Sequence, residues 1–288
     1  MVKQDVPLSY IDLHVHTTCS DGTLSPEKVV RLAASEKIGV LAITDHDNID
    51  GIQRAKVEAQ KFGIKIIPGI ECSTTFDTGK RHILGYHIDP ANEDMIQYVK
   101  TSQNDRIEKI NRILEKLGRL GFKLSFHDVK KFSNGNSIGR LHIAQAMLEK
   151  GYVDSLGEAF KLYIGKGCPA YASVKSFSIE DVIAIIKSAG GIPVIAHPFQ
   201  MNNGDRMAVA KEINHLITLG IEGIEVIYPE HYYNENYFLV MLAFDKELFV
   251  TCGSDFHGTN KKIQLGRCFF NKYKVTTESL KKMGKTFV

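Results

Sequence analysis

The sequence predicts an α/β fold in which seven buried strands alternate with helices. Seven short apolar runs are separated by stretches of helical periodicity, a pattern typical of parallel strands joined by crossover helices. No Gly-rich phosphate loop follows any of these runs, which argues against the Rossmann type of open sheet. We therefore expect a closed barrel, with a doubly wound open sheet as the alternative.

Composition sets wide bounds on the class of protein. The chain has 288 residues, of which 43% are apolar and 24% charged, as in an ordinary globular protein. Its 36 basic and 33 acidic residues give a net charge of +3, which argues neither for nor against nucleic acid as a partner. No apolar run reaches the ~18 residues of a membrane span. The first residues lack the hydrophobic core of a signal peptide, and the five cysteines form no Cys-x-x-Cys pair. We expect a reduced, cytoplasmic protein without a membrane partner.

The first four predicted strands carry polar side chains at or near their ends. Residues 11–15 place Ile11, Leu13 and Val15 on one face, and Asp12, His14 and His16 on the other. Ser25 and Pro26 then begin a helix. The remaining elements are a strand at 40–44 ending in Asp45-His46-Asp47, a helix at 49–62, a strand from 64 leading to Glu71, and a strand at 81–87 containing His82.

Three further strands are predicted in the second half of the chain. The fifth strand, at 192–196, leads into His197. The sixth covers residues 221–227, and the seventh, at 249–251, leads into Asp255 and His257. The chain after Gly258, with a helix at 276–285, is expected to close the structure without taking part in chemistry.

The region from 92 to 165 interrupts this alternation with helical periodicity throughout. Ile107, Ile110, Ile113, Leu114 and Leu117 form one amphipathic stripe, and shorter helices are expected at 126–132, 138–150 and 156–163. Such a segment is far too long for a crossover. We predict that residues 92–165 form a small cap domain inserted into a barrel of residues 1–91 and 166–288.

The polar residues at the strand ends predict a metal centre. In a parallel barrel the carboxyl ends of all strands meet on one face, where sites are built. Imidazole and carboxylate groups together are common ligands of divalent ions. Nine of them are too many for one ion, so two or three ions bridged by a carboxylate are expected. The nine candidate ligands, through which catalysis would proceed, are His14, His16, Asp21, His46, Glu71, His82, His197, Asp255 and His257.

Five motifs resemble, in order, those of the PHP (polymerase and histidinol phosphatase) family of metal-dependent phosphoesterases. They are Asp-Leu-His-Val-His-Thr, Thr-Asp-His-Asp, Gly-Ile-Glu, Ala-His-Pro and Gly-Ser-Asp-Phe-His. The resemblance implies a distorted seven-stranded barrel with two or three ions, Mn foremost, with Fe or Zn as alternatives. It assigns His14, His16, Glu71 and Asp255 to one ion, Glu71 with His82 and His197 to a second, and Asp21, His46 and His257 to a third.

The insertion resembles that of one branch of the family, through residues 137–144, 151–153 and 158–160. Members of this branch are nucleoside 3',5'-bisphosphate phosphatases and 5'-to-3' exonucleases acting on short RNA. Leu141 stands where those relatives usually have proline. The resemblance makes Arg140 and His142 substrate-binding candidates, because the planar fork of an arginine matches phosphate oxygens. Lys166 and His231 are weaker candidates.

The predicted reaction is attack of a metal-activated hydroxide on a phosphomonoester, which requires no Ser or Cys nucleophile. Asp45 and Asp47 are expected to orient His46. The predicted partner is a small phosphorylated nucleotide or a short oligonucleotide, with no obligate protein partner. Three alternatives remain at this point: a histidinol-phosphate phosphatase, a hydrolase of C–N bonds on a similar barrel, and a non-catalytic module that binds metal or phosphate.

Overall fold

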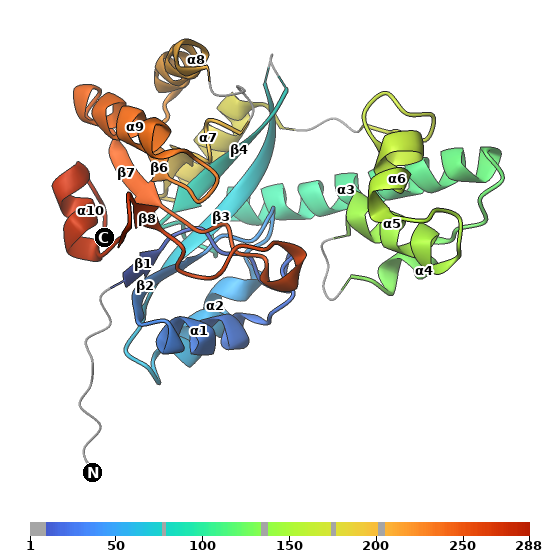
Figure 1. Cartoon of the computed structure of the whole chain (residues 1–288), viewed down its shortest axis with the longest axis horizontal. Helices are drawn as coiled ribbons and strands as arrows, with labels where there is room; N and C mark the ends of the chain where they lie inside the picture. Colours follow the sequence, from blue (N-terminus) through green and yellow to red (C-terminus); the bar gives the residue numbers. More distant parts are fainter. Residues whose placement is uncertain (1–9, 77–78, 134–137, 174–176, 201–204) are drawn as a thin grey trace. The chain divides into compact units, whose positions relative to one another are not determined.

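The computed structural model describes residues 10–76, 79–133, 138–173, 177–200 and 205–288 (Figure 1). The chain divides into two compact units, one formed by Met1–Ile96 with Phe177–Val288 and the other by Gln97–Ser176. The insertion predicted at 92–165 falls largely within the second unit. Ser137, the first residue of the motif that suggested this insertion, lies outside the described residues.

The first unit contains a seven-stranded sheet, and the seven predicted strands are confirmed. They follow one another across the sheet in chain order. The strands are β1 (Tyr10–Asp12), β2 (Ile38–Ile43), β3 (Lys65–Phe76), β4 (Gly79–Tyr86), β5 (Ile192–Ile195), β6 (Gly223–Ile227) and β7 (Phe249–Cys252). Four of the six pairings in this sheet are parallel, so the sheet is mostly parallel.

The prediction of uniformly parallel strands was wrong for β4, which runs antiparallel to both β3 and β5. The cause is the short link from Phe76 to Gly79, because a parallel crossover needs a dozen or more residues. The amino half of β4 therefore lies beside the carboxyl ends of its neighbours. Accordingly, Ala196, just after β5, donates its N–H to the carbonyl of His82 at 3.2 Å.

The helices of this unit are α1 (Pro26–Ser35), α2 (Asp50–Ala59), α7 (Ile179–Ser188), α8 (Arg206–Leu219), α9 (Tyr233–Asp245) and α10 (Thr277–Met283). The predicted start of α1 is confirmed, since the Ser25 side chain accepts a hydrogen bond from the Lys28 N–H. Val29, Val30 and Ala33 on α1 are fully buried and pack in a core that includes Leu41 of β2. None of the helices in the described ranges is long and apolar enough to cross a bilayer.

Beyond their formal ends, the first and seventh strands are joined by backbone hydrogen bonds. The Leu13 N–H donates to the Cys252 carbonyl at 2.9 Å, and the Asp255 N–H donates to the His14 carbonyl at 2.8 Å. The His16 N–H donates to the carbonyl of Phe256 at 2.9 Å. These bonds fix the two histidines of the first motif beside the Asp255 segment.

A short hairpin of β8 (Phe269–Phe270) and β9 (Tyr273–Lys274) lies between β7 and α10 in the chain. Asn271 in its turn has a φ of 58°, in the left-handed region that tight hairpin turns require. The hairpin contacts the start of α9, because the rings of Tyr233 and Phe270 lie 5.4 Å apart.

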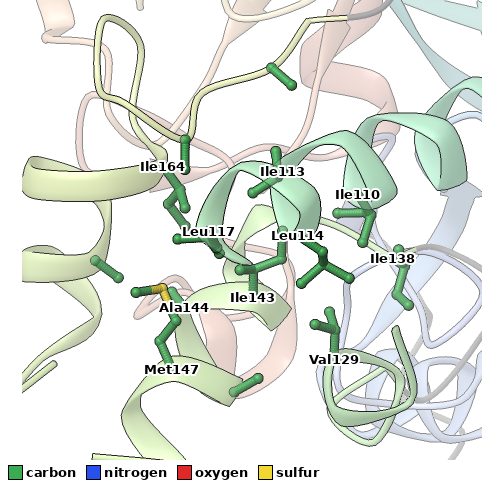
Figure 2. Close-up of a cluster of buried hydrophobic side chains, with 14 of the residues drawn as sticks. Ile110, Ile113, Leu114, Leu117, Val129, Ile138, Ile143, Ala144, Met147 and Ile164 are labelled. Carbon is green, nitrogen blue, oxygen red and sulfur yellow. The ribbon is translucent and has the colours of Figure 1, made fainter. Parts of the chain in front are cut away.

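The second unit is helical where it is described, as predicted. Its elements are α3 (Glu93–Arg119), α4 (Phe126–Lys130), α5 (Arg140–Glu149), α6 (Leu156–Ala159) and a π-helical turn at Phe160–Ile164. Ile110, Ile113, Leu114 and Leu117 of α3 point into one apolar cluster with Met147 of α5 (Figure 2). Their spacing places them on one helix face, which explains most of the predicted stripe. The prediction was wrong for Ile107, whose side chain is exposed.

Candidate metal centre

His14 and His16 lie in the extended segment that follows β1. Leu13 and Val15, which alternate with them along the chain, are buried in the core, so the alternation predicted from the sequence is confirmed. The two imidazole rings lie side by side, with centroids 5.2 Å apart. Gly253 makes room for this arrangement, because a Cβ at that position would lie 2.1 Å from the His14 Cβ.

The Glu71 carboxylate on β3 is surrounded by imidazoles. Its Oε2 lies 3.2, 3.1 and 3.0 Å from ring nitrogens of His14, His16 and His46. Its Oε1 lies 2.8 and 3.1 Å from ring nitrogens of His82 and His197. Burial would raise the pKa of this carboxyl group, but the imidazoles of His46, His82 and His14 hold it well below the ordinary value. Glu71 is therefore an ionised carboxylate at the middle of the cluster.

Two further carboxylates complete the cluster. Oδ1 of Asp255 lies 3.1 Å from Nε2 of His16 and 3.3 Å from Nδ1 of His257. Oδ1 of Asp21 lies 3.2 Å from Nε2 of His257, and its Oδ2 lies 3.9 Å from Nε2 of His46. All nine side chains predicted from the strand ends therefore lie together in the first unit.

The backbone is unusual at the ends of β5 and β7. His197 and Asp255 have φ values of 30° and 53°, in a region that residues other than glycine seldom adopt. Such conformations persist when surrounding contacts enforce them, and they are frequent at functional sites. Here they aim both side chains back toward Glu71 and His14.

The ligand atoms form three overlapping groups in which they lie within 4.8 Å of one another. These groups are His14–His16–Glu71–Asp255, His16–Asp21–His46–His257 and His46–Glu71–His82. The first has the same members as the set expected for one ion. The third contains His46 where the resemblance implied His197, which instead contacts Glu71 directly.

The chemistry of this donor set fits divalent ions. Six buried atoms of the cluster have no hydrogen-bond partner within the described chain, although they face one another. Leaving buried polar atoms without partners costs free energy, unless an ion binds them. These atoms are Nε2 of His14 and His16, Nδ1 of His46 and His82, Oδ1 of Asp21 and Oε2 of Glu71.

The sequence matches the PHP domain over residues 12–251, from the first predicted strand to the last. The chain belongs to the PHP domain family. It is a metal-dependent phosphoesterase and thus a hydrolase of phosphoric esters.

Similarity to relatives within the PHP family extends over almost the whole chain. The 5'-3' exoribonuclease Rnm of Escherichia coli is 32% identical over 258 residues, which are 89% of this chain and 88% of the relative. The 3',5'-nucleoside bisphosphate phosphatase of Chromobacterium violaceum is 32% identical over 251 residues, which are 87% of this chain and 88% of the relative. A crystal structure from Bifidobacterium adolescentis, assigned as a metal-dependent phosphoesterase, superimposes with a TM-score of 0.80 at 28% identity and covers 97% of this chain and 98% of that one.

Glu225 supports the PHP cluster from β6 and was not predicted. Its fully buried carboxylate lies 2.9 Å from Nδ1 of His14 through Oε1, and its Oε2 accepts the His197 N–H at 2.8 Å. The carboxylate thereby directs Nε2 of His14 toward the cluster, as in many metal centres. A lone glutamate within the apolar strand Gly223–Ile227 was the available signal.

Asp45 supports a different histidine from the one expected. Its carboxylate accepts hydrogen bonds from the N–H and hydroxyl of Thr17, both at 2.7 Å, and from the hydroxyl of Ser20 at 2.5 Å. Ser20 in turn lies 3.4 Å from Nδ1 of His16. Asp45 therefore orders the loop around His16 rather than His46. Asp47 accepts hydrogen bonds from the N–H and hydroxyl of Ser73 and so joins the end of β2 to β3.

Lys261 lies in the segment after Gly258, which was expected to take no part in chemistry, and it contacts the metal centre. Its ammonium group contacts Oδ2 of Asp255, the carboxylate oxygen that does not face the histidines. The Tyr228 hydroxyl donates to the same oxygen at 3.0 Å. About a third of the Lys261 side chain is exposed, so the ammonium lies at the boundary between the cluster and solvent.

The four predicted substrate-binding residues lie in different settings. Arg140 begins α5, and its guanidinium lies over the rings of Phe160 and Tyr171. The ring of His142 caps the same helix, since its Nδ1 accepts the Gly139 N–H at 3.0 Å. Lys166 is exposed, and His231 is buried in the first unit.

Proposed function

We propose that this PHP phosphoesterase hydrolyses phosphate esters of nucleotides, above all the 3'-phosphate of nucleoside 3',5'-bisphosphates. The observation that carries the proposal is the cluster of nine imidazole and carboxylate side chains with Glu71 at its middle, in which six buried ligand atoms lack partners in the described residues. The substrate class is supported by the C. violaceum relative, which is named for this activity.

The proposal includes a closed architecture for the sheet and a role for the second unit. The hydrogen bonds of Leu13 and His16 to residues 252 and 256, with the parallel bridge between Val15 and Phe256, support a distorted barrel closed between β1 and β7. The helical unit Gln97–Ser176 would serve as the cap that contributes Arg140 to substrate binding.

We assign the nine ligands to two or three divalent ions, with Mn foremost and Fe or Zn as alternatives. One ion would be held by His14, His16, Glu71 and Asp255, and another by Asp21, His46 and His257. Glu71, His82 and His197 would hold a further one. Such ions, when bound, supply positive charge that neutralises phosphate oxygens and lowers the pKa of water toward neutrality.

The side chains of the protein itself have defined tasks in this reaction. Glu225 holds the His14 ring so that Nε2 is presented to the cluster. Tyr228 and Lys261 bind the outer oxygen of Asp255 and leave Oδ1 directed at the histidines. The exposed part of the Lys261 side chain can also attract the anionic phosphate. Burial raises the pKa of the Cys19 thiol to about 11, so this nearby cysteine stays protonated and is not the nucleophile.

Hydrolysis of the 5' end of short RNA is a second candidate activity. It is supported by the E. coli exoribonuclease, which is as similar to this chain in sequence as the C. violaceum phosphatase. Both activities cleave a phosphate ester next to a second charged group of a nucleotide, so one metal centre could serve both.

Phosphate release from nucleoside 3',5'-bisphosphates, 5'-phosphorylated short RNAs and histidinol phosphate tests the proposal. The assays would use purified protein supplied with Mn²⁺, and the metal content of the protein would be measured by plasma mass spectrometry. We expect turnover of the nucleotides and two or three bound ions per chain. Preference for histidinol phosphate, or absence of turnover of every ester by metal-loaded protein, would reject the proposed substrates.

A further inference from the structure

A cavity of about 420 Å³ lies beside the metal centre, within the first unit. Its volume is in the range of small-molecule sites. Its walls are the start of α9, the segment before α9 and the β8–β9 hairpin, with Tyr228, His231, Asn236, Arg267, Phe269 and Lys272 among the lining residues. Tyr228 belongs to both places, since its hydroxyl bonds to Asp255 while its ring lies 5.1 Å from that of His231.

Buried polar atoms without partners lie in the wall of this cavity. His231 and Asn236 are 92% and 96% buried, as their exposed fractions are 8% and 4%. Within the described ranges no hydrogen bond of normal geometry reaches either ring nitrogen of His231 or Oδ1 of Asn236, although the Asn236 side chain lies beside the His231 ring. Buried polar side chains are ordinarily hydrogen-bonded, so these atoms are available to a ligand with hydrogen-bonding groups.

The charge on the cavity walls favours an anion. Arg267 and Lys272 are exposed and form no ion pair with any described part of the chain. The amino end of the 13-residue helix α9 lies at the same wall through Tyr233 and Asn236, and adds the partial positive charge of its N–H groups. A phosphate group would satisfy both side chains and the helix end.

Aromatic side chains line the same opening. Tyr233 and Phe269 are 51% and 39% exposed, and the guanidinium of Arg267 lies 6.0 Å from the centroid of the Phe269 ring. Exposed aromatic rings next to cationic groups are the combination that binds single-stranded nucleic acids, with bases stacked on the rings.

We propose that this cavity binds a second nucleotide of the substrate, the one that adjoins the phosphate ester hydrolysed at the metal centre. Tyr233 and Phe269 stack on its base, Arg267 and Lys272 bind the phosphate on its 3' side, and His231 and Asn236 hydrogen-bond to its polar edge. This inference rests on the proposed function and sharpens it, because it makes a dinucleotide or short RNA a better substrate than a single nucleotide.

The test compares a mononucleotide with a dinucleotide in matched variants. Kinetics would be measured for uridine 3',5'-bisphosphate and for diuridine phosphorylated at both its 5' and 3' ends, with the double variant Arg267→Ala/Lys272→Ala and the control Lys281→Ala/Lys282→Ala on α10. We expect kcat/KM for the dinucleotide to fall roughly tenfold or more in the cavity variant, since hydrogen bonds to charged groups are lost. The control variant, and the bisphosphate with either variant, should change less than about twofold on the same reasoning.

A variant that removes the proposed base stacking provides an independent test. Tyr233→Ala should lower kcat/KM for the dinucleotide about five- to tenfold, whereas Tyr237→Ala on an exposed site of the same helix should not. Equal loss for both substrates, or no loss for the dinucleotide, would overturn the assignment of the cavity.

Binding separates this inference from the proposed function. The affinity of fluorescently labelled diuridine phosphorylated at both its 5' and 3' ends would be measured by anisotropy, a readout that does not require turnover. Weaker binding by the cavity variant than by its control supports the second-nucleotide site even if no ester is hydrolysed. Equal binding by the two variants rejects it, even if the wild-type protein is an active phosphatase.

Discussion

The metal centre and the helical unit bury different kinds of side chain. Among the described residues of 97–176, His142 is the one buried side chain that is polar or charged, while the rest of that unit's core is apolar. In the first unit, Glu71, Asp255 and four of the surrounding histidines are buried, while His46 and His82 are partly exposed. An apolar core stabilises a fold, whereas clustered ionisable groups cost free energy and are kept for chemistry. We therefore expect substitutions in the two regions to affect activity and stability in opposite ways.

The largest expected effect is loss of activity without loss of fold. His14→Ala or Asp255→Ala should lower phosphate release more than about a hundredfold, since even substitutions outside the ligand sphere cost 10–100-fold. The thermal midpoint of the metal-free protein should stay within a few degrees of wild type, because each change removes a buried ionisable group. Phosphate release and thermal unfolding would be measured on the same preparations. Unfolded variants would show that the cluster is needed for folding.

Leu117→Ala makes the reverse test in the helical unit. This fully buried side chain packs in the cluster of Figure 2, so its truncation should cost roughly 2–5 kcal/mol of the free energy of unfolding. Urea titration followed by circular dichroism would measure this cost. The exposed Leu120 gives a matched control, for which alanine should cost less than about 1 kcal/mol. Similar costs at both positions would remove the distinction between the two regions.

The part of the site that could be predicted from the sequence is the part carried by local pattern. His14 and His16 alternate with buried neighbours, and His46, His197 and Asp255 follow apolar runs at strand ends. Asp21 lies in a turn after the first strand, and His82 lies within the fourth. The antiparallel course of β4 could have been predicted from its short link to β3. The lone glutamate in an apolar strand marked Glu225 as unusual, but the roles of Glu225 and Lys261 could not be predicted, because they depend on contacts with His14 or Asp255 in distant segments. The cavity beside the metal centre could not be predicted either, because its walls come from two separate segments, α9 and the β8–β9 hairpin.

Glu225→Gln should weaken metal binding without abolishing it. The amide retains the shape of the side chain but loses the negative charge that orients and polarises His14. Metal affinity or activity should fall roughly 10–100-fold, as is typical for groups behind a metal ligand. Titration with Mn²⁺ would measure the affinity. Activity that is restored at high Mn²⁺ indicates a role in metal binding, and failure at saturating metal would assign Glu225 a different role.

Metal binding should release protons at neutral pH. Burial would lower the pKa of His16, but the adjacent carboxylates of Asp255 and Glu71 raise it to about 9 in the metal-free protein. A histidine ligand must be neutral, so Mn²⁺ affinity should increase from pH 7 to about 9 and level off above it. Because the pKa of His16 is higher in the folded than in the unfolded chain, its protonation stabilises the metal-free fold. This contribution is fully present below about pH 6.5, the pKa of histidine in the unfolded chain, and it is lost as the pH rises through about 9.

Calorimetry in two buffers of different ionisation enthalpy would count the protons released on Mn²⁺ binding at pH 7. At least one proton per chain is expected, because His16 alone carries one at this pH. Affinity that is independent of pH from 7 to 9, with no proton release, would show that His16 is neutral in the metal-free protein.

The smallest effect should come from substitution of Arg140, the substrate-binding candidate in the helical unit. Arg140 lies over the rings of Phe160 and Tyr171, which restrict its side chain and prepare the guanidinium to bind an anion. Arg140→Ala should reduce kcat/KM about tenfold for a nucleoside 3',5'-bisphosphate, by loss of charge-assisted hydrogen bonds to the second phosphate. A nucleoside 3'-monophosphate, which lacks that phosphate, should be affected little.

Arg119→Ala is the matched control for Arg140, because Arg119 belongs to the same unit but is exposed and paired with Glu115. It should leave both substrates unaffected, since exposed ion pairs contribute little. An Arg140 variant that loses both substrates equally would indicate a structural role around Phe160 and Tyr171. In that case the helical unit would contribute only its apolar core, and the contrast between the two regions would be complete.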